Sequence, residues 1–371
     1  MGFPLVIALA ATAQLVAGAV FAANHPAPVE GDIVLRDFAF RSGTTSPAIN
    51  VHYRTLGTLA RDRTGRAMNA VLILHATGGE GGNFLAERDG SDTFAGELFG
   101  PGQPLDATRY FIVLPDAIGH GRSSKPSDGL RGSFPRYGYR DMIEAQHRLV
   151  TEGLGVDHLR LVIGTSMGGM HTWLWGETWP SFMDGLLPLA SLPTQISGRN
   201  RLWRRILMDA IRNDPTWQAG FYEQQPAALR TATQLLLYVS GNSLMRQASG
   251  PTLAAADRFI DGATAGMAAG SDANDLLWAV DASHDYDPGP ALESISAPLL
   301  AINFADDLVN PPELGILERE IRRVPNGRAV LIPTGPDTVG HGTYIRAAVW
   351  RKHLERFLRQ TARGGAARRS E

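Results

Sequence analysis

Residues 159–180 read LRLVIGTSMGGMHTWLWGETWP, and this stretch predicts a strand, a tight turn and a helix in that order. The apolar run before the turn is rich in β-branched residues, and Pro180 stops the helix-forming segment after it. The turn carries the pattern Gly-x-Ser-x-Gly around Ser166, and its glycines allow the sharp bend that lifts a serine oxygen out of a sheet. We interpret Ser166 as a nucleophile; the alternative is a glycine-rich turn with an incidental serine.

Similar units flank this stretch on both sides. A continuous apolar run indicates a strand that is buried on both faces of a parallel sheet, and helical segments such as 141–154 alternate with these runs. The sequence therefore predicts an α/β fold with a mostly parallel, doubly wound sheet. The further apolar runs lie at 70–74, 110–114, 186–190, 298–303 and 329–333.

The order of these units also predicts the domain organisation. Residues 29–190 read as the first part of the core and begin with an antiparallel hairpin, and residues 291–360 read as its second part. Between them, residues 191–290 are helical and amphipathic, so we expect a lid over the C-terminal ends of the strands. We expect the last amphipathic helix at 345–358 and a disordered tail at 361–371.

The composition describes a globular protein with a large core. Of the 371 residues, 44% are hydrophobic and 19% charged, the formal net charge is −2, and there is no cysteine. This charge balance gives no reason to expect nucleic acid as a partner. The absence of cysteine excludes disulfides, thiolate metal sites and a cysteine nucleophile.

The first 23 residues, MGFPLVIALAATAQLVAGAVFAA, carry no charged side chain and end in small residues. This pattern predicts a secretory signal peptide at 1–23, with cleavage near Ala22 or Ala23. Because no Lys or Arg precedes the apolar segment, an uncleaved membrane anchor remains the alternative. We expect the mature protein to be secreted or periplasmic, without stable membrane insertion after cleavage.

Two further residues can complete a catalytic site with Ser166. Asp307 and His341 each follow a predicted strand, and the order Ser, Asp, His is that of the α/β-hydrolase arrangement. His341 would take the serine proton, while the carboxylate would orient the imidazole. Pro311 lies four residues beyond Asp307 and favours it as the acid, with Asp306 as the alternative. A metal or two-carboxylate glycosidase site lacks a supporting ligand cluster.

A glycine-rich loop, HATGGEGG at 75–82, follows the first of the predicted parallel strands. A loop of this kind can cradle a phosphate, but it lacks the Lys-Ser/Thr ending of a nucleotide loop. We favour an oxyanion loop, because glycines let backbone N–H groups approach a tetrahedral oxygen. His75, His120 and His171 read as packing or supporting residues.

Six segments along the chain have a distinctive sequence, and they lie at 75–78, 105–111, 141 with 145–146, 166–170, 210–215 and 220–222. In this order they resemble the homoserine O-acetyltransferase group of α/β-hydrolases. The resemblance implies Ser166 as nucleophile, Asp307 and His341 as its partners, and oxyanion donors from the backbones of Thr77 and Met167. It also implies the helical lid.

Two departures from this family concern the substrate. The family usually carries Asp directly after the catalytic His, where it meets the substrate amine, and this chain has Gly342. It also usually carries a lid Arg for the substrate carboxylate where this chain has Met208, although Arg204 or Arg205 could substitute. A buried charge without a partner is costly, so we do not expect an amino-acid substrate.

These observations predict a serine hydrolase that cleaves a carboxylic ester, because water is available outside the cytoplasm and acetyl-CoA is expected to be scarce there. The first alternative is an O-acyltransferase with a non-amino-acid acceptor, and the second is a non-catalytic binding module on a hydrolase fold. We expect a small-molecule acyl ester as substrate, no cofactor and no metal. A homodimer is a candidate assembly.

Overall fold

The computed structural model describes residues 24–86 and 94–368 of the chain. The predicted signal peptide at 1–23 lies outside the described residues, so it stays a prediction. Residues 87–93 and 369–371 also lie outside them.

The described strands form one eight-stranded sheet in the order β1-β2-β4-β3-β5-β6-β7-β8. The pairs β1–β2 and β2–β4 are antiparallel, and every other neighbouring pair is parallel. The mostly parallel sheet with an antiparallel hairpin at its start is therefore confirmed. The strands are β1 (Val29–Ala39), β2 (Thr45–Leu56), β3 (Ala70–Leu74), β4 (Phe111–Pro115), β5 (Leu161–Thr165), β6 (Leu186–Leu189), β7 (Leu299–Phe304) and β8 (Gly327–Ile332).

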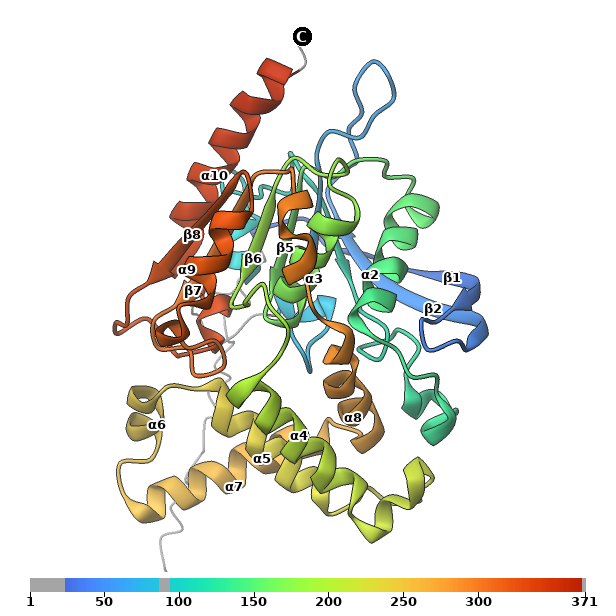
Figure 1. Ribbon diagram of the computed structural model, residues 1–371, viewed down its shortest axis with the longest axis vertical. Helices are drawn as coiled ribbons and strands as arrows, with labels where there is room; N and C mark the ends of the chain where they lie inside the picture. The colour runs from blue at the N-terminus through green and yellow to red at the C-terminus, as the bar shows by residue number, and fades with distance from the viewer. Residues whose placement is uncertain (1–23, 87–93, 369–371) are drawn as a thin grey trace, which may run out of the picture.

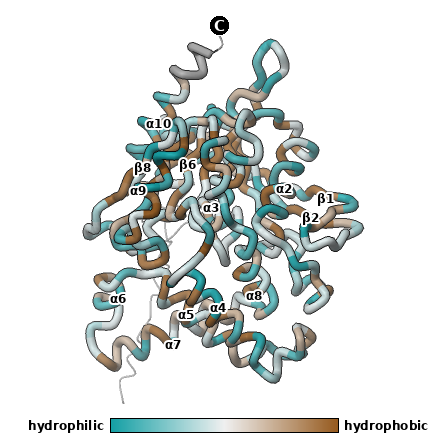
Figure 2. Tube along the Cα trace, in the orientation of Figure 1, coloured by the Kyte–Doolittle hydropathy of each residue, from teal (hydrophilic) through white to brown (hydrophobic). Residues whose placement is uncertain are grey.

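Helices cover both faces of this sheet. Alternate residues of β3 enter two different cores: Leu72 packs in the cluster that includes α2 and α3, and Val71 in the cluster that includes α1 and α10. This alternation is the reason the central strands are apolar throughout. Figure 2 shows hydrophobic residues along β6 at the centre of the molecule. The helices are α1 (Phe94–Leu98), α2 (Tyr139–Arg148), α3 (Met167–Thr178), α9 (Ile316–Glu320) and α10 (Ala347–Arg368).

The predicted lid is a separate group of helices between β6 and β7. Figure 1 shows α4, α5 and α7 together at one end of the core. The lid has its own small core, in which Trp203, Met208 and Tyr222 are buried, whereas Phe221 is exposed. Its helices are α4 (Gly198–Arg212), α5 (Ala228–Ser240), α6 (Ser243–Ser249), α7 (Leu253–Ala269) and α8 (Ala273–Asp281).

The C-terminal helix differs from the sequence prediction. Helix α10 runs to Arg368, beyond the predicted end at 358, so most of the predicted tail at 361–371 is helical (Figure 1). Its first turns bury Ala347, Trp350 and Leu354 against the sheet, and the helix anchored in this way continues through the glycines at 364 and 365. No helix among the described residues is long and apolar enough to span a bilayer.

Candidate active site

Ser166 lies at the tip of the turn between β5 and α3, with φ 52° and ψ −108°. Residues other than glycine rarely adopt this backbone conformation. Such strain persists only where neighbouring residues enforce it. The neighbouring glycines allow this close packing: a Cβ on Gly164 would lie 1.9 Å from the Gly168 carbonyl oxygen, and one on Gly168 2.1 Å from that of Leu74. The helix therefore packs directly against the strands, and the serine is presented above them.

The three residues predicted to form the catalytic site lie within hydrogen-bond distance of one another. The Oγ of Ser166 lies 2.8 Å from Nε2 of His341, and Nδ1 of His341 lies 2.8 Å from Oδ2 of Asp307. A carboxylate only accepts, so the Nδ1–H donates to Asp307 and leaves Nε2 to accept the serine proton. Ser166 and His341 are each 8% exposed and Asp307 is 1% exposed.

Asp307 is held as a carboxylate by several donors. Its Oδ1 accepts from the backbone N–H groups of Val309 (2.7 Å) and Asn310 (3.0 Å), and its Oδ2 accepts from Nδ2 of Asn310 (3.1 Å). Burial raises the pKa of the Asp307 carboxyl, but the His341 ring and the Asn310 hydrogen bonds lower that pKa below its ordinary value. Asp307 is therefore charged at neutral pH and can stabilise an imidazolium.

Asp306, the alternative acid, faces a different set of partners. Its Oδ2 accepts from Nδ2 of Asn242 (2.5 Å), Oγ1 of Thr338 (2.7 Å) and the N–H of Gly340 (3.2 Å). The structure thus places Asp307, and not Asp306, against His341. The Pro311 spacing favoured Asp307 in the sequence but did not exclude Asp306, because both residues follow the same strand.

The predicted oxyanion loop begins at His75, whose ring orients the peptide that follows. Nε2 of His75 accepts from the N–H of Ala117 (3.0 Å), so Nδ1 carries the proton and donates to the carbonyl of Ala76 (2.9 Å). The N–H of Gly79 donates to the same carbonyl (2.9 Å). In a trans peptide the N–H points opposite to the carbonyl, so the Thr77 N–H is directed away from these donors.

The N–H groups of Thr77 and Met167 donate no hydrogen bond within the described part of the chain. Met167 is the first residue of α3, where a backbone N–H has no partner inside the helix. Two free N–H groups beside a nucleophile can stabilise the negative oxygen of a tetrahedral intermediate. The arrangement fits the oxyanion role that the family resemblance implies for both residues.

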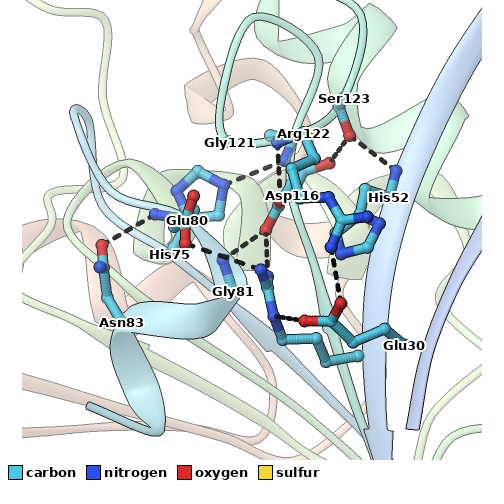
Figure 3. Close-up of polar contacts among 12 residues, drawn as sticks. Glu30, His52, His75, Glu80, Gly81, Asn83, Asp116, Gly121, Arg122 and Ser123 are labelled. Carbon is cyan, nitrogen blue, oxygen red and sulfur yellow. Dashed lines mark hydrogen bonds and ion pairs between the residues drawn. The ribbon is translucent and has the colours of Figure 1, made fainter. Parts of the chain in front are cut away.

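A buried carboxylate, Asp116, anchors the other end of the oxyanion loop. Its Oδ1 accepts from the N–H of Gly81 (2.8 Å) and from Nη1 of Arg54 (3.0 Å), and its Oδ2 accepts from the N–H of Arg122 (2.9 Å). Figure 3 shows Gly81 and Arg122 beside Asp116, with dashed lines for the hydrogen bonds. Sequence reasoning missed Asp116 and Arg54; an acid directly after the buried strand β4 was the available signal.

Three further buried histidines, His75, His120 and His171, lie in surroundings that lower their pKa. Burial lowers the pKa of His120 to about 3, and it also lowers the pKa of His75 and of His171. All three rings are therefore neutral at physiological pH, in agreement with the packing and supporting roles expected from the sequence.

Ser166 and His341 open into a cavity of about 380 Å³ between the core and the lid. The oxyanion loop contributes Ala76, Thr77 and Gly78 to its wall. The lid contributes an apolar surface, and it also contributes Arg204, the one side chain in this lining that carries a permanent charge. The apolar lid residues are Trp203, Leu236, Val239, Met267 and Leu276.

Arg204 is 2% exposed, yet it has no carboxylate partner among the described residues. Its Nε donates to Oδ1 of Asn200 (3.0 Å) and its Nη1 to Oγ of Ser283 (3.3 Å), and burial lowers its pKa. Arg205, the other arginine considered from the sequence, is largely exposed and pairs with Asp209 (2.7 Å). Arg204 is therefore the lid arginine that reaches the cavity, whereas Met208 packs inside the lid.

The sequence profile of the alpha/beta hydrolase fold matches residues 69–335. The chain belongs to the α/β-hydrolase family. The homoserine O-acetyltransferase of Pelobacter propionicus is 32% identical to this α/β-hydrolase over 304 residues, which are 73% of this chain and 80% of that protein. The homoserine O-acetyltransferase of Thermobifida fusca is 38% identical over 194 residues, half of each chain. These relatives place this α/β-hydrolase in the homoserine O-acetyltransferase-like group.

Among solved structures, esterase E22 superimposes with a TM-score of 0.77 at 20% identity, covering 90% of this chain and all of that one. This likeness concerns the fold of the α/β-hydrolase. Its relatives and structural neighbours thus include acyltransferases and esterases, and acyl transfer or acyl hydrolysis is the reaction class that they support for this chain.

Proposed function

We propose that this chain is a serine hydrolase that cleaves a carboxylic ester through an acyl-enzyme on Ser166. The observation that carries the proposal is the unbroken hydrogen-bond chain from Asp307 through His341 to Ser166, which ends in the cavity under the lid. A serine hydroxyl is nearly inert at neutral pH, and this arrangement supplies the base that it needs.

In the proposed acylation step, His341 Nε2 takes the Ser166 proton as Oγ attacks the ester carbonyl carbon. The carbonyl oxygen becomes an oxyanion that accepts from the N–H groups of Thr77 and Met167. His341 then returns the proton to the alcohol oxygen, the C–O bond breaks, and the alcohol leaves. Asp307 remains ionised throughout and stabilises the imidazolium.

The second step releases the acyl group. Water enters the cavity, His341 takes one of its protons, and the resulting attack on the acyl carbon forms the carboxylic acid and restores Ser166. An alcohol in place of water would give acyl transfer by the same steps, and the named relatives support this O-acyltransferase reading as the second candidate. Which acceptor reacts depends on the polarity and occupancy of the cavity.

The cavity wall supports a particular class of ester. Arg204 places one cation there, and no Asp or Glu is part of the described lining. A buried guanidinium without a carboxylate partner is costly, and a substrate anion would pair with it. We propose that the substrate carries a carboxylate and has no ammonium group, which excludes a free amino acid as the acceptor.

We also propose that the protein is exported from the cytoplasm. The ground for this part of the proposal is the signal-peptide pattern of residues 1–23 alone. Outside the cytoplasm water would be the abundant acceptor, which favours hydrolysis over transfer from acetyl-CoA.

The test is a comparison of acceptors with the mature protein. Ser166→Ala should abolish turnover of short p-nitrophenyl esters, because Ser166 Oγ is the hydroxyl that lies 2.8 Å from Nε2 of His341. At a fixed acyl donor, hydrolysis should exceed transfer to added alcohols. Dominant transfer from acetyl-CoA would establish the acyltransferase, and unchanged turnover in Ser166→Ala would refute the serine nucleophile.

A further inference from the structure

Asp306 joins the lid to the loop that carries His341. This loop, residues 333–341, is called the histidine loop. One oxygen of its carboxylate, Oδ2, accepts from Nδ2 of Asn242 in the lid (2.5 Å), and it also accepts from Thr338 Oγ1 (2.7 Å) and the Gly340 N–H (3.2 Å). Gly340 directly precedes His341 in the chain. A single atom therefore ties a lid residue to two positions of the histidine loop.

The lid side of this contact is fixed as well. Asn242 precedes α6, and its Oδ1 accepts from the N–H of Met245 (2.7 Å), so the side chain caps this helix. Its Nδ2 also donates to the carbonyl of Thr338 (3.2 Å). Asn242 thus uses its acceptor within the lid and its donor across the gap to the histidine loop.

The two backbones also approach each other closely. Gly340 has φ +72°, and a Cβ at this position would lie 2.8 Å from the backbone nitrogen of Asn242. Only glycine fits both the conformation and the contact. The histidine loop is therefore packed against the turn between α5 and α6, with no room for a side chain between them.

The same part of the lid lines the cavity. Val239 and Ser240, at the end of α5, belong to the cavity wall, and Asn242 follows two residues later. A ligand that moves the end of α5 would move Asn242, and Asn242 is bonded to Asp306 and Thr338. A short, continuous path thus leads from the cavity wall to the residue before His341.

We propose that Asp306 and Asn242 form a clamp that makes the position of the His341 ring depend on the seated lid. Both are positioning residues that act through His341, and the inference rests on the proposed role of His341 as the base. The clamp assigns separate tasks to the adjacent acids: Asp307 orients the ring from within the site, and Asp306 holds the loop that carries it.

The size of the expected effect follows from the geometry of proton transfer. His341 accepts from Ser166 over 2.8 Å, and a displacement of about 1 Å in such a site can lower the rate by about a hundredfold. The clamp does not border the cavity, so its loss should change kcat more than KM.

Four single variants separate the clamp from general stability. Asp306→Ala removes the shared acceptor, and Asn242→Ser removes the amide donor Nδ2 but keeps an oxygen that can cap α6. Asp306→Asn retains an acceptor at the same position. Asp337→Ala is the matched control, because Asp337 lies in the same loop and its exposed side chain has no hydrogen bond or ion pair within the described residues.

Each variant is measured for kcat and KM on a p-nitrophenyl ester, for the rate of fluorophosphonate labelling of Ser166, and for thermal unfolding. We expect Asp306→Ala and Asn242→Ser to lose about ten- to a hundredfold in kcat and in labelling rate, with KM nearly unchanged. Asp306→Asn should lose less than Asp306→Ala, and Asp337→Ala should stay close to the wild type. The double variant Asp306→Ala/Asn242→Ser should resemble Asp306→Ala, because both substitutions break the same hydrogen bond between the two residues.

The proposal is overturned if folded Asp306→Ala and Asn242→Ser label as fast as the wild type, or if their losses add in the double variant. If only Asp306→Ala lost kcat and labelling rate, the proposed dependence of His341 on the lid would be refuted. A wild-type chain that is not labelled at Ser166 would instead contradict the proposed function itself, and with it the clamp.

Discussion

Asp306 and Asp307 are adjacent in the chain, but only Asp307 contacts His341, through a 2.8 Å hydrogen bond to the ring, while Asp306 bonds the N–H of Gly340 beside it. The first residues after a strand can point in different directions within one turn. Because the two acids have different partners, the same substitution at each position tests their separate roles.

Asp307→Asn should lower kcat by about 10⁴ with little change in KM, because an amide cannot hold the His341 ring in the required tautomer or stabilise its charge. Steady-state kinetics on a p-nitrophenyl ester measure this loss. The matched substitution Asp306→Asn should cost less than about tenfold, since an amide oxygen can still accept from the clamp. Equal losses in the two variants would contradict the assignment of Asp307 as the acid.

His75→Ala should reduce kcat by about ten- to a hundredfold, because the Ala76 carbonyl loses a donor and the Thr77 N–H loses its fixed direction. KM should change little, since the ring is buried behind the loop. His147→Ala is the control: this ring stacks on Trp179, away from the cavity lining. A kcat for His75→Ala equal to that of the control would show that the ring does not orient the oxyanion loop.

Arg204→Met should remove a preference for esters that carry a carboxylate. Rates on 4-nitrophenyl hemisuccinate and 4-nitrophenyl butyrate compare an anionic with a neutral acyl group, and rates on 4-acetoxybenzoate and phenyl acetate make the same comparison on the alcohol side. A charge-assisted hydrogen bond contributes about 1.5–3 kcal/mol, so kcat/KM on the preferred anionic ester should fall by about ten- to a hundredfold.

The control for this substitution is Arg205→Met, whose side chain is exposed on the same helix. It should leave the preference intact. A wild-type chain that favours neither anionic ester would refute the proposed carboxylate site.

Asp275 predicts a pH-dependent stability. Burial, with a smaller contribution from Asp272, raises the pKa of its carboxyl to about 6. The folded state therefore binds a proton more tightly than the unfolded state, and this group destabilises the fold increasingly as pH rises from about 4 to about 6.

Asp275→Asn should therefore raise the unfolding temperature more at about pH 8 than at about pH 4. Thermal unfolding of the variant and the wild type at both values measures the difference. A variant whose gain is equal at the two values, or larger in acid, would contradict the raised pKa.

The sequence predicted the elbow around Ser166 well, because strand, turn and helix are determined by neighbouring residues. It also predicted His341 from chain order and flanking glycines. It favoured Asp307 by the Pro311 spacing but could not exclude Asp306, since both follow β7 and Asn242, the lid partner of Asp306, lies 64 residues away in the chain.

The errors and omissions have similar physical causes. The position of Arg204 in the cavity depends on the rotation of α4 within the lid, which tertiary packing determines. The anchor at Asp116 joins β2, the oxyanion loop and the loop after β4, so no local pattern reveals it. The predicted end of the last helix was wrong because small residues were read as a break, whereas α10 continues through them.

The most direct test of the account is covalent trapping of the nucleophile. The mature protein is incubated with a fluorophosphonate and analysed by intact and peptide mass spectrometry, beside Ser166→Ala and His341→Ala. The account predicts one adduct on Ser166 in the wild type, none in Ser166→Ala, and much slower labelling in His341→Ala. A wild-type chain without an adduct, or with the adduct on another residue, would contradict it.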